Sequence, residues 1–248
     1  MINGSSRQLS TGVSMRELSQ WEFLLSALGP DHRAMRPRWT EPLVALLAPP
    51  LCVSCGAHAG PAEPFCRACR VGLAWLDQCQ APVAGVPAWA PVAYAGPARA
   101  LVGSLKFRGA RPAAAAMASQ IAAAVPADWL QGMALVPVPL HPARLRSRGY
   151  NQAALIAQQL SVASGLAVAD CLVRDGPATT QVGRDRTRRA TGIFGRVHVR
   201  RGTTVPPAVL LVDDVITTGA TVAACSDALR SAGCFHVRAL SYARTPGR

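Results

Sequence analysis

The sequence predicts an α/β fold with a parallel sheet flanked by helices, and two observations lead to this expectation. From Pro91 onward, short apolar runs alternate with helix-like segments, which is the pattern of strands joined by helical crossovers. Near the end of the chain, apolar residues 209–212 run directly into two carboxylates and a hydroxyl-rich turn, after which another helix-like segment begins. This order places a polar loop beyond the carboxyl end of a buried strand, where open α/β sheets bind their ligands.

Individual elements of this region follow from apolar periodicity and from the residues that begin and end helices. Pro112 suits a first helical turn, Asn151 suits an N-cap, and Gly165 and Gly233 suit helix ends. We therefore expect helices at residues 98–105, 112–125, 151–164 and 221–231, and strands at residues 134–138, 166–173, 209–212 and 237–242. Residues 174–189 are polar without apolar periodicity, and we expect a long mobile loop there.

The composition indicates a globular protein with an affinity for anions. Half of the 248 residues are apolar and 16% are charged, which excludes a disordered chain. The formal net charge of +13 favours polyanions such as nucleic acid or phosphorylated metabolites, although a solvated basic face is the alternative. No apolar run reaches the roughly 20 residues of a membrane span, and the start of the chain lacks a secretory pattern. We expect a cytoplasmic protein without a membrane span.

The loop after residues 209–212 has the composition of a sugar-phosphate site. A helix N-terminus with a glycine and hydroxyl groups binds phosphate well, and here the residues are Thr217, Thr218, Gly219, Ala220 and Thr221. Asp213 and Asp214 would repel the phosphate itself, so they suit ribose hydroxyls or a hydrated Mg²⁺ ion beside it. An ordinary strand-to-helix turn with an Asx cap is the alternative. The pattern is more specific than a generic glycine-rich loop.

Cysteine spacing predicts a metal site nearer the start of the chain. Cys52 and Cys55 form one CxxC pair, and Cys66 and Cys69 form a second pair ten residues later. Two such pairs can supply the four sulfurs of a structural Zn²⁺ ion, with an iron–sulfur centre or free thiols as alternatives. The remaining cysteines are expected to be small buried apolar side chains, and they are Cys79, Cys171, Cys225 and Cys234.

Basic residues cluster in two further places. Arg144, Arg146 and Arg148 follow the expected strand at residues 134–138 and could neutralise a ligand with several negative charges. They could instead track single-stranded DNA, with Tyr150, Trp75 or Trp89 as stacking faces. Lys106 and Arg108 are weaker candidates for the same anionic site, and residues 184–189 could contact either kind of ligand.

Taken together, these segments resemble the ComF family, the group of competence protein F and GntX-like proteins, whose phosphoribosyl pyrophosphate motif matches the loop at residues 213–221. Further matching segments are residues 51–55, 66–69, 106–109, 136–141 and 148–152 and the pair at 180 and 181. The resemblance implies a type I phosphoribosyltransferase fold preceded by a zinc ribbon. It also implies that Asp213 and Asp214 hold ribose and that residues 217–221 hold the 5-phosphate. Pro139, His141 and Arg144 would then lie on the pyrophosphate side.

Four regions and three functions follow from this resemblance. We expect an extension at residues 1–34, a zinc-ribbon region at 35–82, a linker at 83–90 and a phosphoribosyltransferase-like domain at 91–248. The first function is binding of phosphoribosyl pyrophosphate with Mg²⁺ in a protein of DNA uptake that handles single-stranded DNA and contacts DNA-uptake proteins. The second is a salvage-type transferase, in which a base or amine displaces pyrophosphate from the ribose. The third is a catalytically inactive interaction scaffold.

Overall fold

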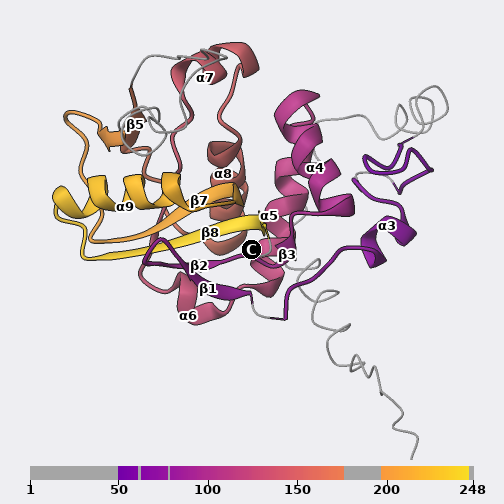
Figure 1. Cartoon of the computed structure of the whole chain (residues 1–248), viewed down its shortest axis with the longest axis horizontal. Helices are drawn as coiled ribbons and strands as arrows, with labels where there is room; N and C mark the ends of the chain where they lie inside the picture. The colour runs from indigo at the N-terminus through magenta and orange to yellow at the C-terminus, as the bar shows by residue number, and fades with distance from the viewer. Residues whose placement is uncertain (1–49, 61–62, 78, 176–196, 246–248) are drawn as a thin grey trace, which may run out of the picture. The chain divides into compact units, whose positions relative to one another are not determined.

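The structure, a computed structural model, describes residues 50–60, 63–77, 79–175 and 197–245, all within one compact unit that spans residues 42–248 (Figure 1). The extension expected at residues 1–34 and nearly all of the loop expected at residues 174–189 lie outside these ranges, as do the pair at 180 and 181 and the basic residues 184–189. Among the described residues, no helix is both long and apolar enough to cross a membrane.

A mostly parallel sheet forms the centre of the domain. Within the described ranges it has six strands, which are β1 (Gln80–Val83), β2 (Val86–Trp89), β3 (Val92–Ala93), β4 (Ala134–Pro137), β7 (Ala208–Ile216) and β8 (His236–Arg244). The strand order is β1-β2-β8-β7-β4, with β3 also paired to β8, and the β1–β2 pair is antiparallel while the other pairs are parallel. The two longest strands, β7 and β8, therefore lie side by side at the middle of the sheet.

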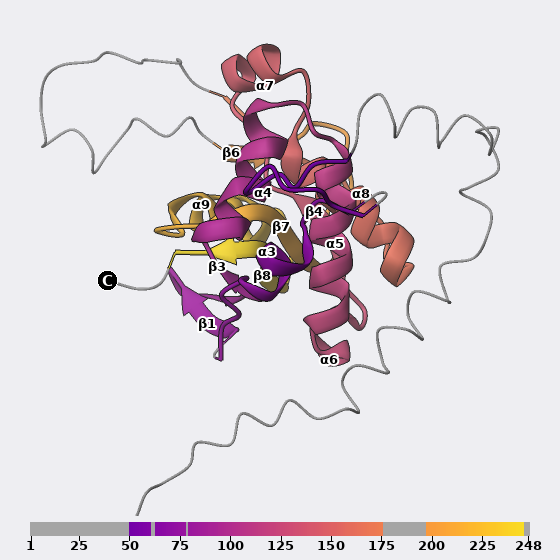
Figure 2. The same cartoon turned by 90° about the vertical axis from the view of Figure 1, so that its right-hand side faces the viewer.

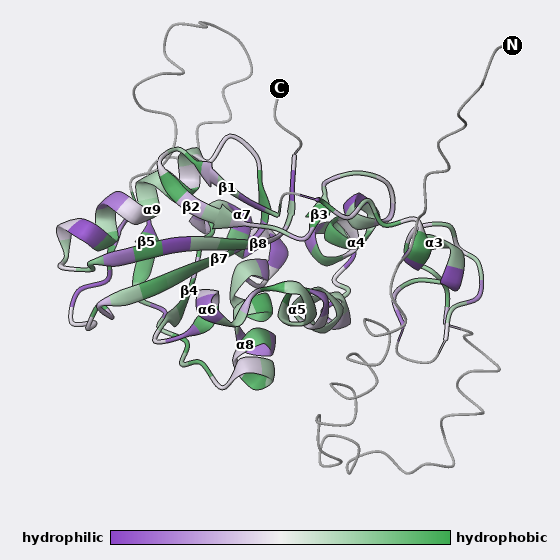
Figure 3. Cartoon of the chain, turned by 90° about the horizontal axis from the view of Figure 1, so that it is seen from below, coloured by the Kyte–Doolittle hydropathy of each residue, from purple (hydrophilic) through white to green (hydrophobic). Residues whose placement is uncertain are grey.

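Helices cover both faces of this sheet (Figures 1 and 3). Those described are α3 (Arg67–Val71), α4 (Gly96–Phe107), α5 (Pro112–Ala124), α6 (Ala127–Leu130), α7 (Pro142–Arg148), α8 (Gln152–Ser164) and α9 (Ala220–Ser231). Strand β7 buries Leu210 and Val212 in one core with α4, α5 and α8, and it buries Val209 and Leu211 in a second core with α9. Because β7 is buried on both faces, its residues 209–212 are all apolar and do not alternate with polar residues. The predicted α/β fold class with a parallel sheet and flanking helices is confirmed.

Two smaller units are attached to the sheet domain. The cysteine-rich segment shares the core of α4 and α5, because Phe65 and Leu73 are buried in the same apolar cluster as Leu101. Strands β5 (Leu172–Arg174) and β6 (Val197–Val199) form a separate antiparallel pair, and β6 packs against α9. The cysteine-rich segment is therefore joined to the main domain by a common core.

The helix boundaries agree closely with those expected from the sequence. Asn151 caps α8 by accepting a hydrogen bond from the Ala153 N–H at 3.0 Å, and Gly165 ends that helix in the left-handed conformation. The strand expected at residues 166–173 is only partly formed. Leu135 exchanges two backbone hydrogen bonds of 2.8 Å with residues on either side of Val168, and the chain then leaves the sheet and forms β5.

The linker expected at residues 83–90 is wrong, because this stretch contributes the β1–β2 hairpin to the sheet. Ala84 and Gly85 both have positive φ, as a two-residue hairpin turn requires, and Val86 and Trp89 are buried. Pro82 and Pro87 suggested irregular structure in the sequence. Proline is tolerated here because β1 is an edge strand and because Pro87 precedes Ala88, where the pairing of β2 with β8 begins.

Candidate functional site

The two adjacent carboxylates lie inside strand β7 and project to opposite faces of the sheet. Strand pairing with β8 continues through Asp213 to Ile216, so the strand extends four residues beyond the end of its apolar run. Side chains alternate between the two faces of a strand, so Asp214 projects to the same face as Leu210 and Val212. It is buried there, on the side of α4. Asp213 projects to the same face as Val209 and Leu211, which pack against α9, and it is half-buried. One pair of neighbours in sequence therefore meets two different environments.

Asp214 forms an ion pair across the core with the last turn of α4. The Lys106 Nζ lies 2.7 Å from Asp214 Oδ2, and the Asp214 side chain is only 3% exposed. A carboxylate that is nearly removed from water requires such a partner to remain ionised. Lys106 thus fixes α4 against the carboxyl end of β7.

Asp213 has a strongly shifted acidity. Burial raises the pKa of its carboxyl well above the usual range, and the neighbouring Asp214 carboxylate raises it further. The Asp214 backbone N–H, which donates to Asp213 Oδ1 at 2.8 Å, and the charge of Lys106 oppose this rise. Folding therefore disfavours ionisation of Asp213, whereas Asp214 has Lys106 as its ion-pair partner.

A pocket of about 230 Å³ opens at this end of the sheet. Its lining includes seven residues that the sequence singled out, namely Lys106, Pro139, Arg144, Asp213, Asp214, Thr217 and Thr221. It also includes Tyr94, Gln152 and Arg174, which sequence reasoning missed. Three cations face two carboxylates in this lining, so the pocket suits a ligand with several negative charges and hydroxyl groups.

Arg174 enters the pocket from strand β5. Burial lowers the pKa of its guanidinium, and the nearby Arg144 lowers it further, while Asp213 opposes the shift. An arginine remains protonated despite such a shift. No sequence motif marked this residue, because only the fold brings β5 to the end of β7.

The other basic residues expected at this site do not line the pocket. His141 is the N-cap of α7, where its Nδ1 accepts a hydrogen bond from the Ala143 N–H at 3.2 Å. Arg146 is exposed on α7. Arg148 donates to Gln152 Oε1 at 2.6 Å, and its guanidinium carbon lies 5.5 Å from the centre of the Phe107 ring. Of the α7 arginines, only Arg144 reaches the pocket.

The loop at residues 217–221 (the phosphate loop) turns at Gly219 into helix α9. Gly219 has φ 77° and is the N-cap of α9 without a side-chain cap of its own. The Ala220 N–H donates to Thr218 Oγ1 at 3.5 Å, and the next N–H groups of the first turn can face an anion. A Cβ at Gly219 would lie 2.0 Å from Val83 Cγ1. The tip of the β1–β2 hairpin therefore packs directly on the phosphate loop and permits only glycine there.

The four predicted metal ligands come together at a separate site. The sulfurs of Cys52, Cys55, Cys66 and Cys69 lie within 4.8 Å of one another, and Cys55 Sγ is 3.7 Å from Cys66 Sγ. Sulfurs about 2.3 Å from a tetrahedral metal ion lie about 3.8 Å apart, so the cluster fits such an ion. The adjacent Cys55 thiol raises the pKa of Cys69 to about 12. A bound cation would favour the thiolate form of all four cysteines and would therefore oppose this rise in the pKa of Cys69.

The other cysteines lie away from this cluster. Cys171, Cys225 and Cys234 are buried, as expected for small apolar side chains. Cys79 is half-buried, and its thiol donates to the Leu76 carbonyl at 2.9 Å.

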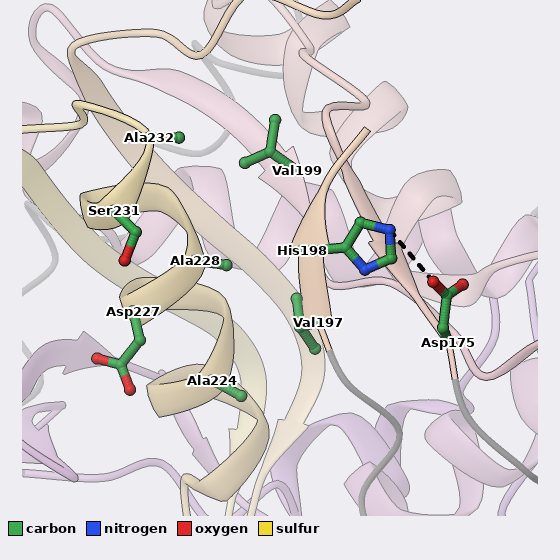
Figure 4. Close-up of a pocket in the computed structure, with 9 residues that line it drawn as sticks. All are labelled: Asp175, Val197, His198, Val199, Ala224, Asp227, Ala228, Ser231 and Ala232. Carbon is green, nitrogen blue, oxygen red and sulfur yellow. Dashed lines mark ion pairs between the residues drawn. The ribbon is translucent and has the colours of Figure 1, made fainter. Parts of the chain in front are cut away.

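A larger hollow of about 610 Å³ lies elsewhere, between β6 and α9 (Figure 4). Its floor consists of small apolar residues such as Ala224 and Ala228, and at one side His198 pairs with Asp175 at 3.2 Å. Neither Asp213 nor the phosphate loop contributes to its lining. The smaller pocket at the end of β7 is therefore the better candidate for the functional site.

The raised pKa of Asp213 makes a prediction about stability. Because ionisation of Asp213 opposes folding, stability falls as pH rises through its folded pKa, and the effect vanishes below the unfolded value of about 3.9. Asp213→Asn should therefore raise the melting temperature near neutral pH, with a gain over the native protein that shrinks in acid. Thermal unfolding across pH measures this. Asp227→Asn removes an exposed carboxylate on α9 and is the control; an equal gain from both changes would contradict the prediction.

A second prediction concerns the stability cost of replacing Gly219, which has a positive φ and lies against Val83. Gly165→Ala meets open space at a similar φ of 72° and should cost only about 1–2 kcal/mol of unfolding free energy. Gly219→Ala adds the clash with Val83 and should cost distinctly more, part of which Val83→Ala restores. Urea unfolding of the two single alanine variants and of the double variant measures this. Equal losses at the two glycines would show that the hairpin does not press on the loop.

Comparison with known proteins relates this geometry to proteins of bacterial competence. No family model matches the chain. The chain is 37% identical over 115 residues to competence protein F of Haemophilus influenzae, covering 45% of this chain and 50% of that protein. It is 34% identical over 110 residues to competence protein ComFC of Streptococcus pneumoniae, covering 44% of this chain and 47% of that protein. The chain thus spans about half the length of the curated relatives it matches.

One solved structure, of the allosteric regulatory enzyme of purine biosynthesis, resembles 67% of this chain and 28% of its own, with 18% identity and a TM-score of 0.32. A similarity at that level does not bear on function. The resemblance to the ComF family that the motifs indicate is confirmed by the two curated competence proteins.

Proposed function

We propose that the protein binds phosphoribosyl pyrophosphate, or a closely related sugar phosphate, together with Mg²⁺ at the end of strand β7. The observation that carries this proposal is the meeting, in one pocket, of two carboxylates, three cations and the start of helix α9. Phosphate groups require the cations and the helix N-terminus, and a ribose ring requires the carboxylates. A ligand with a phosphate but no hydroxyl groups would give the carboxylates no hydrogen-bond donor.

Each part of the pocket has a task in this proposal. The phosphate loop binds the 5-phosphate through backbone N–H groups and through the Thr217 and Thr221 hydroxyls. Asp213 and Asp214 accept hydrogen bonds from the ribose hydroxyls. Lys106, Arg144 and Arg174 face the pyrophosphate side, with Arg174 as a residue that the motifs did not indicate. Bound Mg²⁺ would supply further positive charge on the pyrophosphate oxygens.

Phosphoribosyl transfer is the second function that this pocket permits. An acceptor base or amine would displace pyrophosphate from C1 of the ribose, while the protein positions the ring and stabilises the departing charge. His141, Arg146 and Arg148 lie outside the lining, so they would not contact the ligand in the pocket. An inactive scaffold is the remaining alternative, and it predicts that the pocket binds no phosphoribosyl compound.

We further propose that the protein acts in the cytoplasm during DNA uptake and handles single-stranded DNA with DNA-uptake proteins as partners. The names of the two curated relatives, competence protein F and competence protein ComFC, support a role in competence. The charge pattern supports contact with a polyanion, because the net charge is +13 and α7 carries three arginines within seven residues.

For the cysteine cluster, we propose a structural Zn²⁺ ion. Four sulfurs at tetrahedral spacing fill every position of a zinc ion and leave none open for a substrate. Cys52 is buried in the core that also contains Phe65 and Leu101. The ion would therefore stabilise the contact between the cysteine-rich segment and α4.

Calorimetry tests the pocket with ligands that differ by one hydroxyl. Ribose 5-phosphate should bind more tightly than 2-deoxyribose 5-phosphate, and phosphoribosyl pyrophosphate with Mg²⁺ more tightly than either. The combined change Asp213→Asn and Asp214→Asn should weaken ribose 5-phosphate about tenfold or more, since each hydrogen bond to a charged group contributes about 1.5–3 kcal/mol. It should also abolish the preference for the 2-hydroxyl.

The matched control for this experiment is Asp227→Asn, which should change neither affinity nor preference. Absence of phosphoribosyl pyrophosphate binding by the native protein would contradict the proposed pocket and favour the scaffold. Release of pyrophosphate in the presence of a base or amine would favour the transferase.

Metal analysis tests the cysteine site. The native protein should contain about one zinc ion per chain, and Cys66→Ser should lose it together with thermal stability. Cys79→Ser leaves the four clustered sulfurs unchanged and should retain the metal. Retention of zinc by Cys66→Ser, or iron in place of zinc in the native protein, would overturn the assignment.

A further inference from the structure

An aromatic ring lies exposed beside the proposed pocket. Phe107 is the last residue of α4, directly after Lys106, and it is 78% exposed. A single exposed apolar side chain is common on protein surfaces and indicates an interaction only together with neighbouring features. Both stacking tryptophans suggested by the sequence are less suitable, because Trp89 is buried and Trp75 is not among the residues that contact the α7 arginines.

Arginine side chains hold this ring and its surroundings in place. The guanidinium of Arg148 lies over the Phe107 ring at 5.5 Å and is itself fixed by the hydrogen bond to Gln152. Next to it, the guanidinium of Arg111 lies 5.2 Å from the centre of the Tyr150 ring, and the Tyr150 hydroxyl donates to the Leu105 carbonyl. The ends of α4 and α7 and the start of α5 are thus joined by two cation–π contacts, as their proximity in Figure 2 illustrates.

The charge around Phe107 is positive and is not offset locally. Residues 79–127 and 129–169 contain no aspartate or glutamate, although they carry all the basic residues of α4, α5 and α7. Within the described ranges, the ion pairs involve Lys106 but none of Arg108, Arg111, Arg146 or Arg148. Arg108, Arg111 and Arg146 are exposed. These guanidinium groups therefore remain available to an external anion.

We propose that Phe107, Arg108, Arg111, Arg146 and Arg148, here called the Phe107 surface, form a binding surface for single-stranded DNA. An unpaired base stacks on the open face of Phe107, and the arginines contact the phosphates on either side of it. Double-stranded DNA cannot stack on Phe107, because the faces of its bases are covered by neighbouring bases within the helix. The inference rests on the proposed handling of single-stranded DNA and assigns that role to particular residues.

The Phe107 surface adjoins the pocket but uses other side chains. Lys106 lines the pocket and pairs with Asp214, whereas Phe107 next to it points to solvent. Likewise Gln152 lines the pocket, while its partner Arg148 covers Phe107. Changes at the surface should therefore alter DNA affinity and leave phosphoribosyl binding unchanged.

Fluorescence anisotropy with a labelled oligothymidylate of about 20 nucleotides, longer than a typical site, tests the proposal. Phe107→Leu keeps an apolar side chain but loses the ring, and it should weaken binding about tenfold, as expected for loss of one stacked base. Phe235→Leu is the matched control: Phe235 is 79% exposed but lies directly before the amino-terminal end of β8, whereas the pocket lies at the carboxyl end of β7, and its change should have no effect.

Salt titration tests the arginines separately. The double change Arg108→Gln and Arg146→Gln should reduce the slope of log affinity against log salt by about 1.4, which is about 0.7 for each lost phosphate contact. The control is the pair Arg201→Gln and Arg230→Gln, two exposed arginines from outside the Phe107 surface, which should leave the slope nearly unchanged.

The possible outcomes distinguish this inference from the proposed function. The inference is supported if the variants of the Phe107 surface lose oligonucleotide affinity, their controls do not, and the affinity for phosphoribosyl pyrophosphate stays native. Equal effects of Phe107→Leu and Phe235→Leu overturn the assignment of the surface and leave DNA handling in place. Absence of oligonucleotide binding by the native protein overturns both the surface and DNA handling, whereas the pocket is judged by calorimetry alone.

Discussion

The ion pair between Lys106 and Asp214 is the contact on which the rest of the site depends. Asp214 is almost completely buried at the end of a central strand, and Lys106 reaches it from the last turn of α4. Loss of one partner of such a buried pair costs about 3–5 kcal/mol, because the other charge is left without compensation. The pair therefore fixes the end of α4, and with it the position of Phe107, relative to the phosphate loop. One interaction sets both the pocket and the surface beside it.

A second constraint acts from the other side of the phosphate loop. The hairpin tip at Val83 leaves no room for a Cβ at Gly219, so the loop is confined between the hairpin and α9. Confinement holds the first N–H groups of α9 in a fixed direction before any ligand binds. A rigid arrangement of this kind binds an anion with little reorganisation. Glycine at this position thus follows from packing as well as from its positive φ.

The sequence predicted the elements whose determinants are local. Helices α5 and α8, the phosphate loop and the cysteine pairs follow from capping residues, periodicity and spacing over a few positions. Features set by distant contacts were missed, among them Arg174 in the pocket and the exposure of Phe107. The hairpin at residues 80–89 was hidden by its prolines, whose tolerance depends on an edge position that only the complete sheet defines. Apart from the linker, the domain boundaries remain predictions, as do the roles of the site residues.

The distribution of carboxylates would separate the two ligands that we propose, a sugar phosphate and a DNA strand. Asp213 and Asp214 lie at the pocket, whereas α4, α5, α7 and α8 contain none. A phosphate of a DNA backbone that entered the pocket would meet these carboxylates and gain no compensating hydroxyl, since deoxyribose lacks the 2-hydroxyl. At the Phe107 surface the same phosphate meets only arginines. Under the two proposals made above, the carboxylates select for ribose inside the pocket and direct the strand to the surface outside it.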